Sequence, residues 1–388
     1  MAAEEARQRR GLAAGAGAGL RERMSESLSA NTKAILLLTA PLIVGRRAPG
    51  DRSVKPLSLN REYNLLAKRL REIERAPADL LGADAGSVLS ECLGAADPAV
   101  ESLDPGRIEA LLGRGMQLSL AVENWQARAI WVLSRADDGY PSRLKRRLGS
   151  GAPAVLYGCG ERSFLDCGGL AVVGPRAAAK DLLAYARDVG ELAAEAGRTV
   201  VSGGARGVDR AAMSGALAAG GRASGVLASD LARAATHRDN RDALLDGRLI
   251  LVSAYDPAAR FLPGHAMERN HSVYGLADAA LVVDALTDGG GTRAGAVAHL
   301  GDSKRSTACP VYVRSTLGAS EGLAALETLG AIPWLNPKNP DELAEVLEQR
   351  GVKAATTGGR EAQVSATEAP SRIETARQQL MLPVGKPP

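Results

Sequence analysis

From Leu170 onward, short apolar runs alternate with longer stretches in which apolar residues recur at helical spacing. The apolar runs are continuous, without polar residues at every second position, which is typical of strands buried on both faces of a parallel sheet. We predict strands over 170–173, 199–201, 225–227, 249–252, 280–283 and 311–313, and helices between them that include 178–196, 208–219 and 293–300. Strands that are each followed by a helix predict an α/β fold with a doubly wound, mostly parallel Rossmann-like sheet.

Residues 31–130 carry helical signals instead. Leu66, Leu70 and Ile73 lie on one face of the segment REYNLLAKRLREI, and Pro105 stands at the first-turn position of a later helix. We predict a small helical N-terminal domain over 31–130 and a Rossmann-like domain over 131–350. The composition of 1–30 and 351–388 predicts a disordered leader and a disordered tail.

Composition narrows the class of protein. Of 388 residues, 45% are hydrophobic and 24% are charged, which excludes a wholly disordered chain and a coiled coil. The net charge of +4 permits a polyanionic partner without requiring one. Aromatic residues make up only 3%, with two Phe, so stacking of bases on rings is not expected to be the main source of affinity.

Neither a metal site nor a membrane segment is expected. The four cysteines show no C-x-x-C spacing, and the four histidines show no H-E-x-x-H spacing. No apolar run reaches the ~18 residues of a membrane helix. We therefore expect a cytoplasmic protein without a resident cofactor.

Three glycine-rich turns follow predicted strands. Such turns aim backbone N–H groups and helix N-termini at anions, and arginines beside them favour phosphate. The residues are Gly174 and Arg176 in the first turn, Ser202, Gly203, Gly204, Arg206, Gly207 and Asp209 in the second, and Gly289, Gly290, Gly291, Thr292 and Arg293 in the third. Pro175 restricts the backbone beside Arg176, so Arg176 is expected to contribute most to phosphate binding.

Two further basic segments have open interpretations. The segment MERNHSV adds Arg269 and Asn270, and we expect Arg269 to lie on a helix beyond the crevice. The second segment contributes Arg143, Lys145, Arg146 and Arg147. It is interpreted as a solvated helix face, with an extended DNA track as the alternative. The sequence has neither the G-x-G-x-x-G pattern with its downstream acid nor a Walker A motif, which disfavours dinucleotide enzymes and P-loop ATPases.

The order of several motifs resembles the DprA/Smf family of DNA-processing proteins. The motifs are GYPSRLKRRL, VVGPR, SGGARGVD, GRLILVS, ERNHSVYGLADAALVVDA and GGGT, spread between residues 131 and 334. The resemblance implies a Rossmann-like domain that binds single-stranded DNA, forms a homodimer and passes the DNA to the RecA recombinase. The role could be in transformation, repair or defence.

The resemblance also implies which residues cradle phosphate. They are Gly174 and Arg176, then Ser202, Gly203, Gly204 and Arg206, then Arg269 and Asn270, with Asp209 bracing the second turn. Three positions depart from the family pattern: Pro175 replaces a Ser, Met213 a His and His271 an Arg. These departures indicate a divergent member.

Two alternatives use the same turns. Phosphoribohydrolase-like enzymes place a catalytic Glu after a P-G-G-x-G-T turn, but here Ala294, Gly295 and Ala296 follow Thr292. With no nucleophile, base or metal set in view, we expect no catalysis. The second alternative is a sensor that binds a free nucleotide and regulates a partner through the helical domain, and the sequence leaves it open.

Overall fold

The structure is a computed structural model that describes residues 28–42, 54–94, 102–287, 290–301, 309–315 and 320–347. Of the leader predicted over 1–30, only residues 28–30 fall within these ranges. The tail predicted over 351–388 lies outside them entirely. Asp288 and Gly289 of the third turn also lie outside the described residues.

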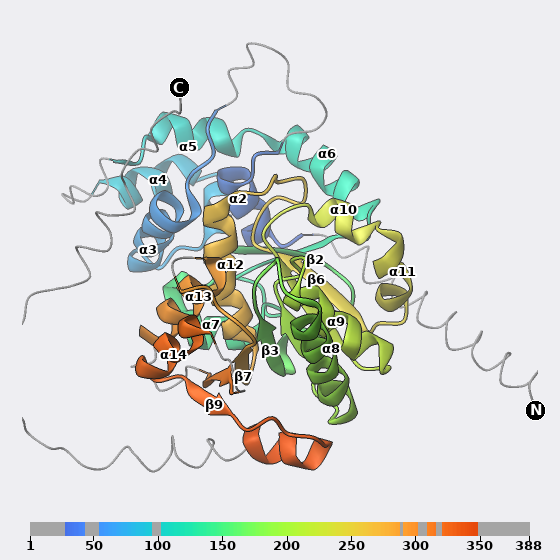
Figure 1. Ribbon diagram of the computed structural model, residues 1–388. Coiled ribbons are helices and arrows are strands. Elements are labelled where there is room, and N and C mark those ends of the chain that lie inside the picture. Colours follow the sequence, from blue (N-terminus) through green and yellow to red (C-terminus); the bar gives the residue numbers. More distant parts are fainter. Residues whose placement is uncertain are drawn as a thin grey trace, which may run out of the picture. The chain divides into compact units, whose positions relative to one another are not determined.

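In the described part of the chain, nine strands form one sheet (Figure 1). The strands are β1 (Trp131–Ser134), β2 (Val155–Cys159), β3 (Leu170–Val173), β4 (Val200–Ser202), β5 (Ala223–Leu227), β6 (Leu249–Ser253), β7 (Ala279–Val282), β8 (Val311–Arg314) and β9 (Ile332–Trp334). Their order across the sheet is β1-β2-β6-β5-β4-β3-β7-β8-β9.

The six predicted strands are all present, and the predicted doubly wound fold is confirmed. From β6 to β9 all neighbours pair in parallel, whereas β1 and β2 pair antiparallel with each other and β2 pairs antiparallel with β6. The chain winds outward from β3 to β6 in one direction and continues from β7 in the other. The order therefore reverses between β3 and β7, which is the point where such sheets bind ligands.

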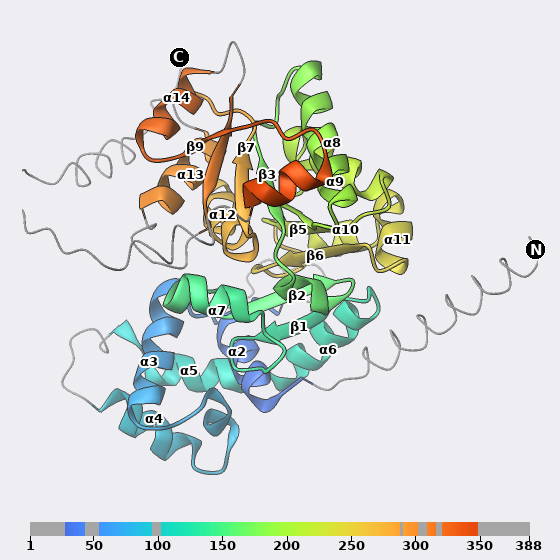
Figure 2. The same ribbon diagram turned by 90° about the horizontal axis from the view of Figure 1, so that it is seen from below.

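Helices cover both faces of the parallel strands (Figure 2). One face packs against α8 (Lys180–Glu195), α9 (Val208–Ala218), α10 (Leu231–Ala235) and α11 (Arg238–Leu245). The other packs against α12 (Pro263–Leu276), α13 (Gly291–Gly301) and α14 (Glu321–Thr328), and α7 (Ser142–Leu148) packs against α12. Along β3, Leu170 and Val172 join the first core, whereas Ala171 and Val173 join the second. This alternation explains why the strand is apolar throughout.

The N-terminal part is helical, as expected. It contains α2 (Ala30–Thr39), the π-helical turn η1 (Leu59–Tyr63), α3 (Asn64–Glu72), the 3₁₀ turn η2 (Pro77–Leu81), α4 (Ala85–Leu93), α5 (Pro105–Leu112) and α6 (Gly115–Gln126). Residues 34–38 of α2 are all buried, and these helices gather beside β1 and β2 (Figure 2). Thr32 of α2 donates to the Asp137 carboxylate after β1 over 2.6 Å. The division into domains at residue 130 stays a prediction.

Candidate nucleic-acid interface

The glycine-rich turns lie at one edge of the sheet. The first follows β3, the second joins β4 to α9, and the third leads from β7 into α13. Because parallel strands point the same way, their carboxyl ends share one edge, and the first and third turns flank the reversal between β3 and β7. The Thr292 hydroxyl donates to the carbonyl of Gly174 over 2.9 Å, which joins the third turn to the first.

Asp209 holds the first two turns together. Its side chain is buried in the first turn of α9, and its carboxylate accepts backbone N–H groups of Gly174, Gly203 and Ala205. Burial raises the pKa of Asp209, and Arg269 together with these N–H groups opposes that rise. One carboxylate thus fixes backbone from both turns.

Arg269 does not lie beyond the crevice, so that expectation was wrong. It lies on α12, is only 8% exposed, and places Nη1 3.8 Å from Asp209 Oδ2. Burial lowers the pKa of Arg269, and Asp209 opposes this. The guanidinium occupies the space beside Gly203, where an added Cβ would lie 1.3 Å from Nη1. A glycine at 203 is therefore what admits the arginine into the crevice.

Gly207 brings the first and second turns into contact. Its φ is +88°, a conformation that residues with a side chain rarely adopt. A Cβ at this position would lie 2.4 Å from the carbonyl oxygen of Pro175 and 2.6 Å from that of Arg176. The glycine thus serves both the backbone turn and the close approach of the two loops.

Arg176 is exposed beside the turns, with its guanidinium 4.5 Å from the ring centroid of Phe261. Phe261 is 42% exposed, and its apolar neighbours Leu262 and Met267 are 52% and 48% exposed. A cation above an aromatic ring is held by the ring's electrostatic field. Phe261 was not among the predicted site residues, although only two Phe occur in the chain and this one stands eight residues before Arg269.

Two of the predicted phosphate ligands use their polar side chains inside the protein. Ser202 is fully buried and donates its hydroxyl to the carbonyl of Val172 over 2.6 Å. Asn270 donates its side-chain amide to the carbonyl of Gly291 over 2.9 Å and packs against Gly295. These side chains support the turns rather than face outward. Arg206 is exposed, and Gly204 has a positive φ of +64°.

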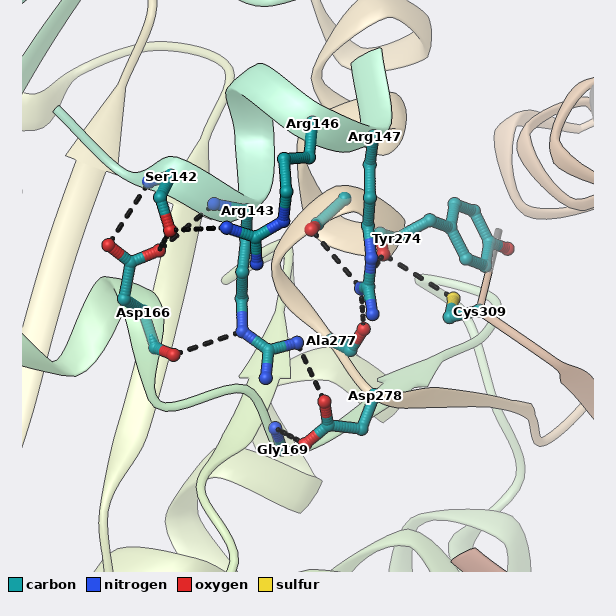
Figure 3. Close-up of polar contacts among 11 residues, drawn as sticks. Ser142, Arg143, Arg146, Arg147, Asp166, Gly169, Tyr274, Ala277, Asp278 and Cys309 are labelled. Carbon is teal, nitrogen blue, oxygen red and sulfur yellow. Dashed lines mark hydrogen bonds and ion pairs between the residues drawn. The ribbon is translucent and has the colours of Figure 1, made fainter. Parts of the chain in front are cut away.

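The basic segment on α7 anchors this helix to the loop before β7 (Figure 3). Arg143 forms an ion pair of 2.6 Å with Asp278, whose other oxygen accepts the backbone N–H of Gly169 over 2.9 Å. Arg147 donates to the carbonyls of Tyr274, Gly275 and Ala277 at the end of α12. Such carbonyls have no partner within their own helix.

The interpretation of the α7 segment as a solvated face is therefore wrong for Arg143 and Arg147. Both are partly buried, and their guanidinium groups are used in holding α7, α12 and β7 together. Lys145 and Arg146 are exposed, although Arg146 also donates to Ser142 of its own helix over 2.9 Å. Lys145 donates to the carbonyl of Asp137 over 3.4 Å, so each of the four basic residues has a partner within the protein.

Comparison with known proteins decides the family. A family model described as DNA recombination-mediator protein A matches residues 131–339, more than half of the chain. The chain belongs to this family. The matched residues contain all three turns, Arg269 and the anchored helix α7. The resemblance drawn from the motifs is therefore confirmed.

Individual relatives are distant. Protein Smf from Synechocystis is 27% identical over 317 residues, which cover 74% of this chain and 78% of the relative. The X-ray structure of DNA processing protein A from Streptococcus pneumoniae matches with a TM-score of 0.54 and 21% identity, over 74% of this chain and 98% of that one. It shows the shared fold. DNA processing protein A from Helicobacter pylori, solved for its single-stranded DNA binding mode, matches with a TM-score of 0.45 and 21% identity, over 57% and 96%.

Two kinds of feature are absent from the described ranges. None of the helices there is long and apolar enough to cross a membrane. Nor do three or more His, Cys, Asp or Glu side chains come together there in a way that could hold a metal ion.

Proposed function

We propose that this protein binds single-stranded DNA in the cytoplasm, through the sugar-phosphate backbone, at the edge of the sheet where the three turns meet. The observation that carries the proposal is the joint placement of the turns, braced by Asp209 and Arg269, with the exposed Arg176 beside them. Backbone N–H groups in glycine turns and guanidinium groups are the donors that phosphate oxygens prefer. Gly290, Gly291 and Thr292 would add the N-terminus of α13 to this set.

The same placement favours single strands with little sequence preference. Contacts to phosphate position a strand but do not identify its bases. Phe261 beside Arg176 offers one exposed ring on which an unpaired base can stack, whereas the bases of a duplex are already stacked. We therefore expect a backbone-bound strand with one local stacking contact.

The family supports a further step, in which the bound strand is protected and then passed to a RecA-type recombinase. Nuclease digestion tests protection, because a labelled strand should survive longer when the protein covers it. Transfer is tested by adding recombinase to the coated strand and following filament assembly. Filaments that form more slowly than on strands coated with an unrelated single-strand binder would contradict the transfer step.

We propose no covalent chemistry at the site. The position where a phosphoribohydrolase-like enzyme needs its acid is packed, because a Cβ at Gly295 would lie 2.6 Å from the Asn270 side-chain nitrogen. The test is incubation with DNA and with nucleotides. Steady release of free base or phosphate that a substitution at Asp209 abolishes would contradict this proposal.

A homodimer through the α/β part belongs to the same proposal, because it follows from the family. Light scattering at micromolar concentration should give twice the mass of the 388-residue chain. A monomeric mass in the presence and absence of DNA would contradict the dimer and leave the binding site standing.

A further inference from the structure

A cavity lies where the N-terminal helical part meets α7 and α12. Its volume is about 860 Å³, within the ~300–1,000 Å³ of small-molecule sites. Asn60 and Arg61 of η1 line one side, and Tyr255, His265 and Arg269 line another. Arg269 thus lies both on the wall of the cavity and at the glycine-rich turns, because its guanidinium also reaches Asp209 and Gly203.

The charge of the cavity wall favours an anion. Arg61, Arg147 and Arg269 line it, with Glu268 as the only lining carboxylate among the described residues. Glu268 is already engaged, since it accepts the Tyr255 hydroxyl over 2.9 Å and the Asn60 amide over 3.1 Å. Because Asp209 balances the charge of Arg269, the charges of Arg61 and Arg147 exceed that of Glu268 by one positive charge. This excess lies in a partly enclosed space, where electrostatic attraction is stronger than in water.

The wall also contains a planar stack. The rings of Tyr255 and His265 are stacked with centroids 3.7 Å apart and an angle of 10° between their planes. Flat π-faces of this kind pack against other flat rings. The Tyr255 hydroxyl is fixed by Glu268, so the stack is held in one orientation.

Two buried polar atoms of this wall lack a hydrogen-bond partner among the described residues. They are Nδ1 of His265 and Nε of Arg269. Arg269 is 8% exposed, so leaving its Nε–H without a hydrogen-bond acceptor costs free energy. Both atoms have almost no accessible surface, so they lie just behind the wall, and an occupant would reach them only after a small shift of these side chains.

We propose that this cavity binds a nucleotide unit, with its phosphate among the arginines and its base against the Tyr255–His265 stack. The nucleotide is either a free nucleoside monophosphate or one nucleotide of a bound DNA strand. Binding of a nucleotide that belongs to a DNA strand rests on the proposed function, whereas binding of a free monophosphate does not. Because η1 and α12 both line the cavity, its occupant bridges the helical part and the DNA-binding edge through Arg269.

The first experiment measures binding of adenosine monophosphate by equilibrium dialysis to the full chain, and to Arg61→Ala and His265→Ala variants of confirmed thermal stability. Saturable binding is expected, weakened about tenfold or more in each variant. This is the scale of one lost charge-assisted hydrogen bond for Arg61 and of one lost stacking contact with the base for His265. Arg71→Ala is the matched control, since Arg71 is an exposed arginine on α3 that does not line the cavity. Adenosine and inorganic phosphate should each bind more weakly than the nucleotide.

The second experiment distinguishes a free monophosphate from a strand nucleotide in the cavity. It also distinguishes failure of the cavity proposal from failure of the proposed DNA binding. If a single-stranded oligonucleotide displaces the monophosphate from the unmodified protein but not from Arg176→Ala, the cavity takes part of the strand. Monophosphate that stays bound beside the strand assigns the cavity to a free nucleotide. The inference is overturned if Arg61→Ala and His265→Ala bind the monophosphate and the oligonucleotide as tightly as Arg71→Ala does. It is also overturned if Arg176→Ala is the one variant that loses monophosphate binding. Loss of strand binding with intact monophosphate binding would overturn only the proposed function.

Discussion

The Arg269 guanidinium lies 3.8 Å from the Asp209 carboxylate, and each side chain is only 7% exposed. The two residues come from α12 and α9, and the same carboxylate accepts N–H groups from the first and second turns. The pair is therefore the point at which two helices and two glycine-rich turns are held together.

Separating the pair should destabilise the fold. Arg269→Met leaves the buried Asp209 carboxylate without its cation, and Asp209→Asn leaves the buried Arg269 guanidinium without its anion. Each substitution should therefore lower the unfolding free energy by about 3–5 kcal/mol. The double variant should cost clearly less than the sum of the two, because neither charge is then left alone. Urea unfolding of all four proteins measures this. Additive losses would show that the two charges do not interact.

Gly203→Ala should displace Arg269. An added Cβ would lie 1.3 Å from Nη1, so the guanidinium must leave its place beside the turn. We expect a loss of stability together with weaker strand binding, measured by thermal unfolding and by titration with a labelled oligonucleotide. Gly86→Ala in α4 is the control, because nothing lies within 4 Å of its Cβ position. Alanine suits a helix better than glycine, so this variant should be as stable as the unmodified protein or more stable by up to about 1 kcal/mol. Equal stability of the two variants would contradict the packing described for Gly203.

Arg176→Ala should weaken strand affinity by about 1.5–3 kcal/mol, the range for a hydrogen bond to a charged group. The loss should exceed that of Arg206→Ala, because Arg176 is held over the Phe261 ring. Arg176→Lys should recover only part of it, since an ammonium lacks the bidentate fork. Arg269→Ala is no fair comparison, because it also breaks the buried pair. If Arg176→Ala binds the strand as tightly as the unmodified protein, the strand does not contact Arg176.

Protonation of the Glu62 carboxylate should lower the unfolding free energy at acidic pH. Partial burial by itself raises the pKa of Glu62, but hydrogen bonds from Arg107 and Ser58 lower it from 4.5 to about 2. A depressed carboxyl pKa means that the ionised form stabilises the fold above about pH 4.5, and that this contribution is lost as the pH falls toward 2. Unfolding free energies measured across this window should converge for the unmodified protein and Glu62→Gln. A constant difference between them would contradict the prediction.

Much of this arrangement could be predicted from the sequence, because parallel strands and the turns that follow them leave local signals. Six strands appear as short continuous apolar runs, and the parallel topology then places their turns at one edge. The strands β1, β2 and β9 were missed. The first two pair antiparallel outside the strand-helix repeat, and β9 is three residues long with Pro333 at its centre.

Side-chain partners were harder to predict, because they depend on distant parts of the chain. An arginine is usually exposed, and Arg269 is buried only because Asp209, 60 positions earlier, supplies its counter-charge. Nothing local shows that the Ser202 hydroxyl turns inward to Val172. The stacking of Arg176 on Phe261 likewise joins two loops that are remote in sequence.

Fluorescence anisotropy with labelled oligonucleotides measures whether this protein prefers single-stranded DNA. The unmodified protein should bind a single strand more tightly than the matching duplex, and strands of different sequence should bind alike. The logarithm of the binding constant should fall linearly with the logarithm of salt concentration, with a slope of roughly −0.7 for each phosphate contacted. Absence of binding at low salt, or equal affinity for duplex, would contradict the account.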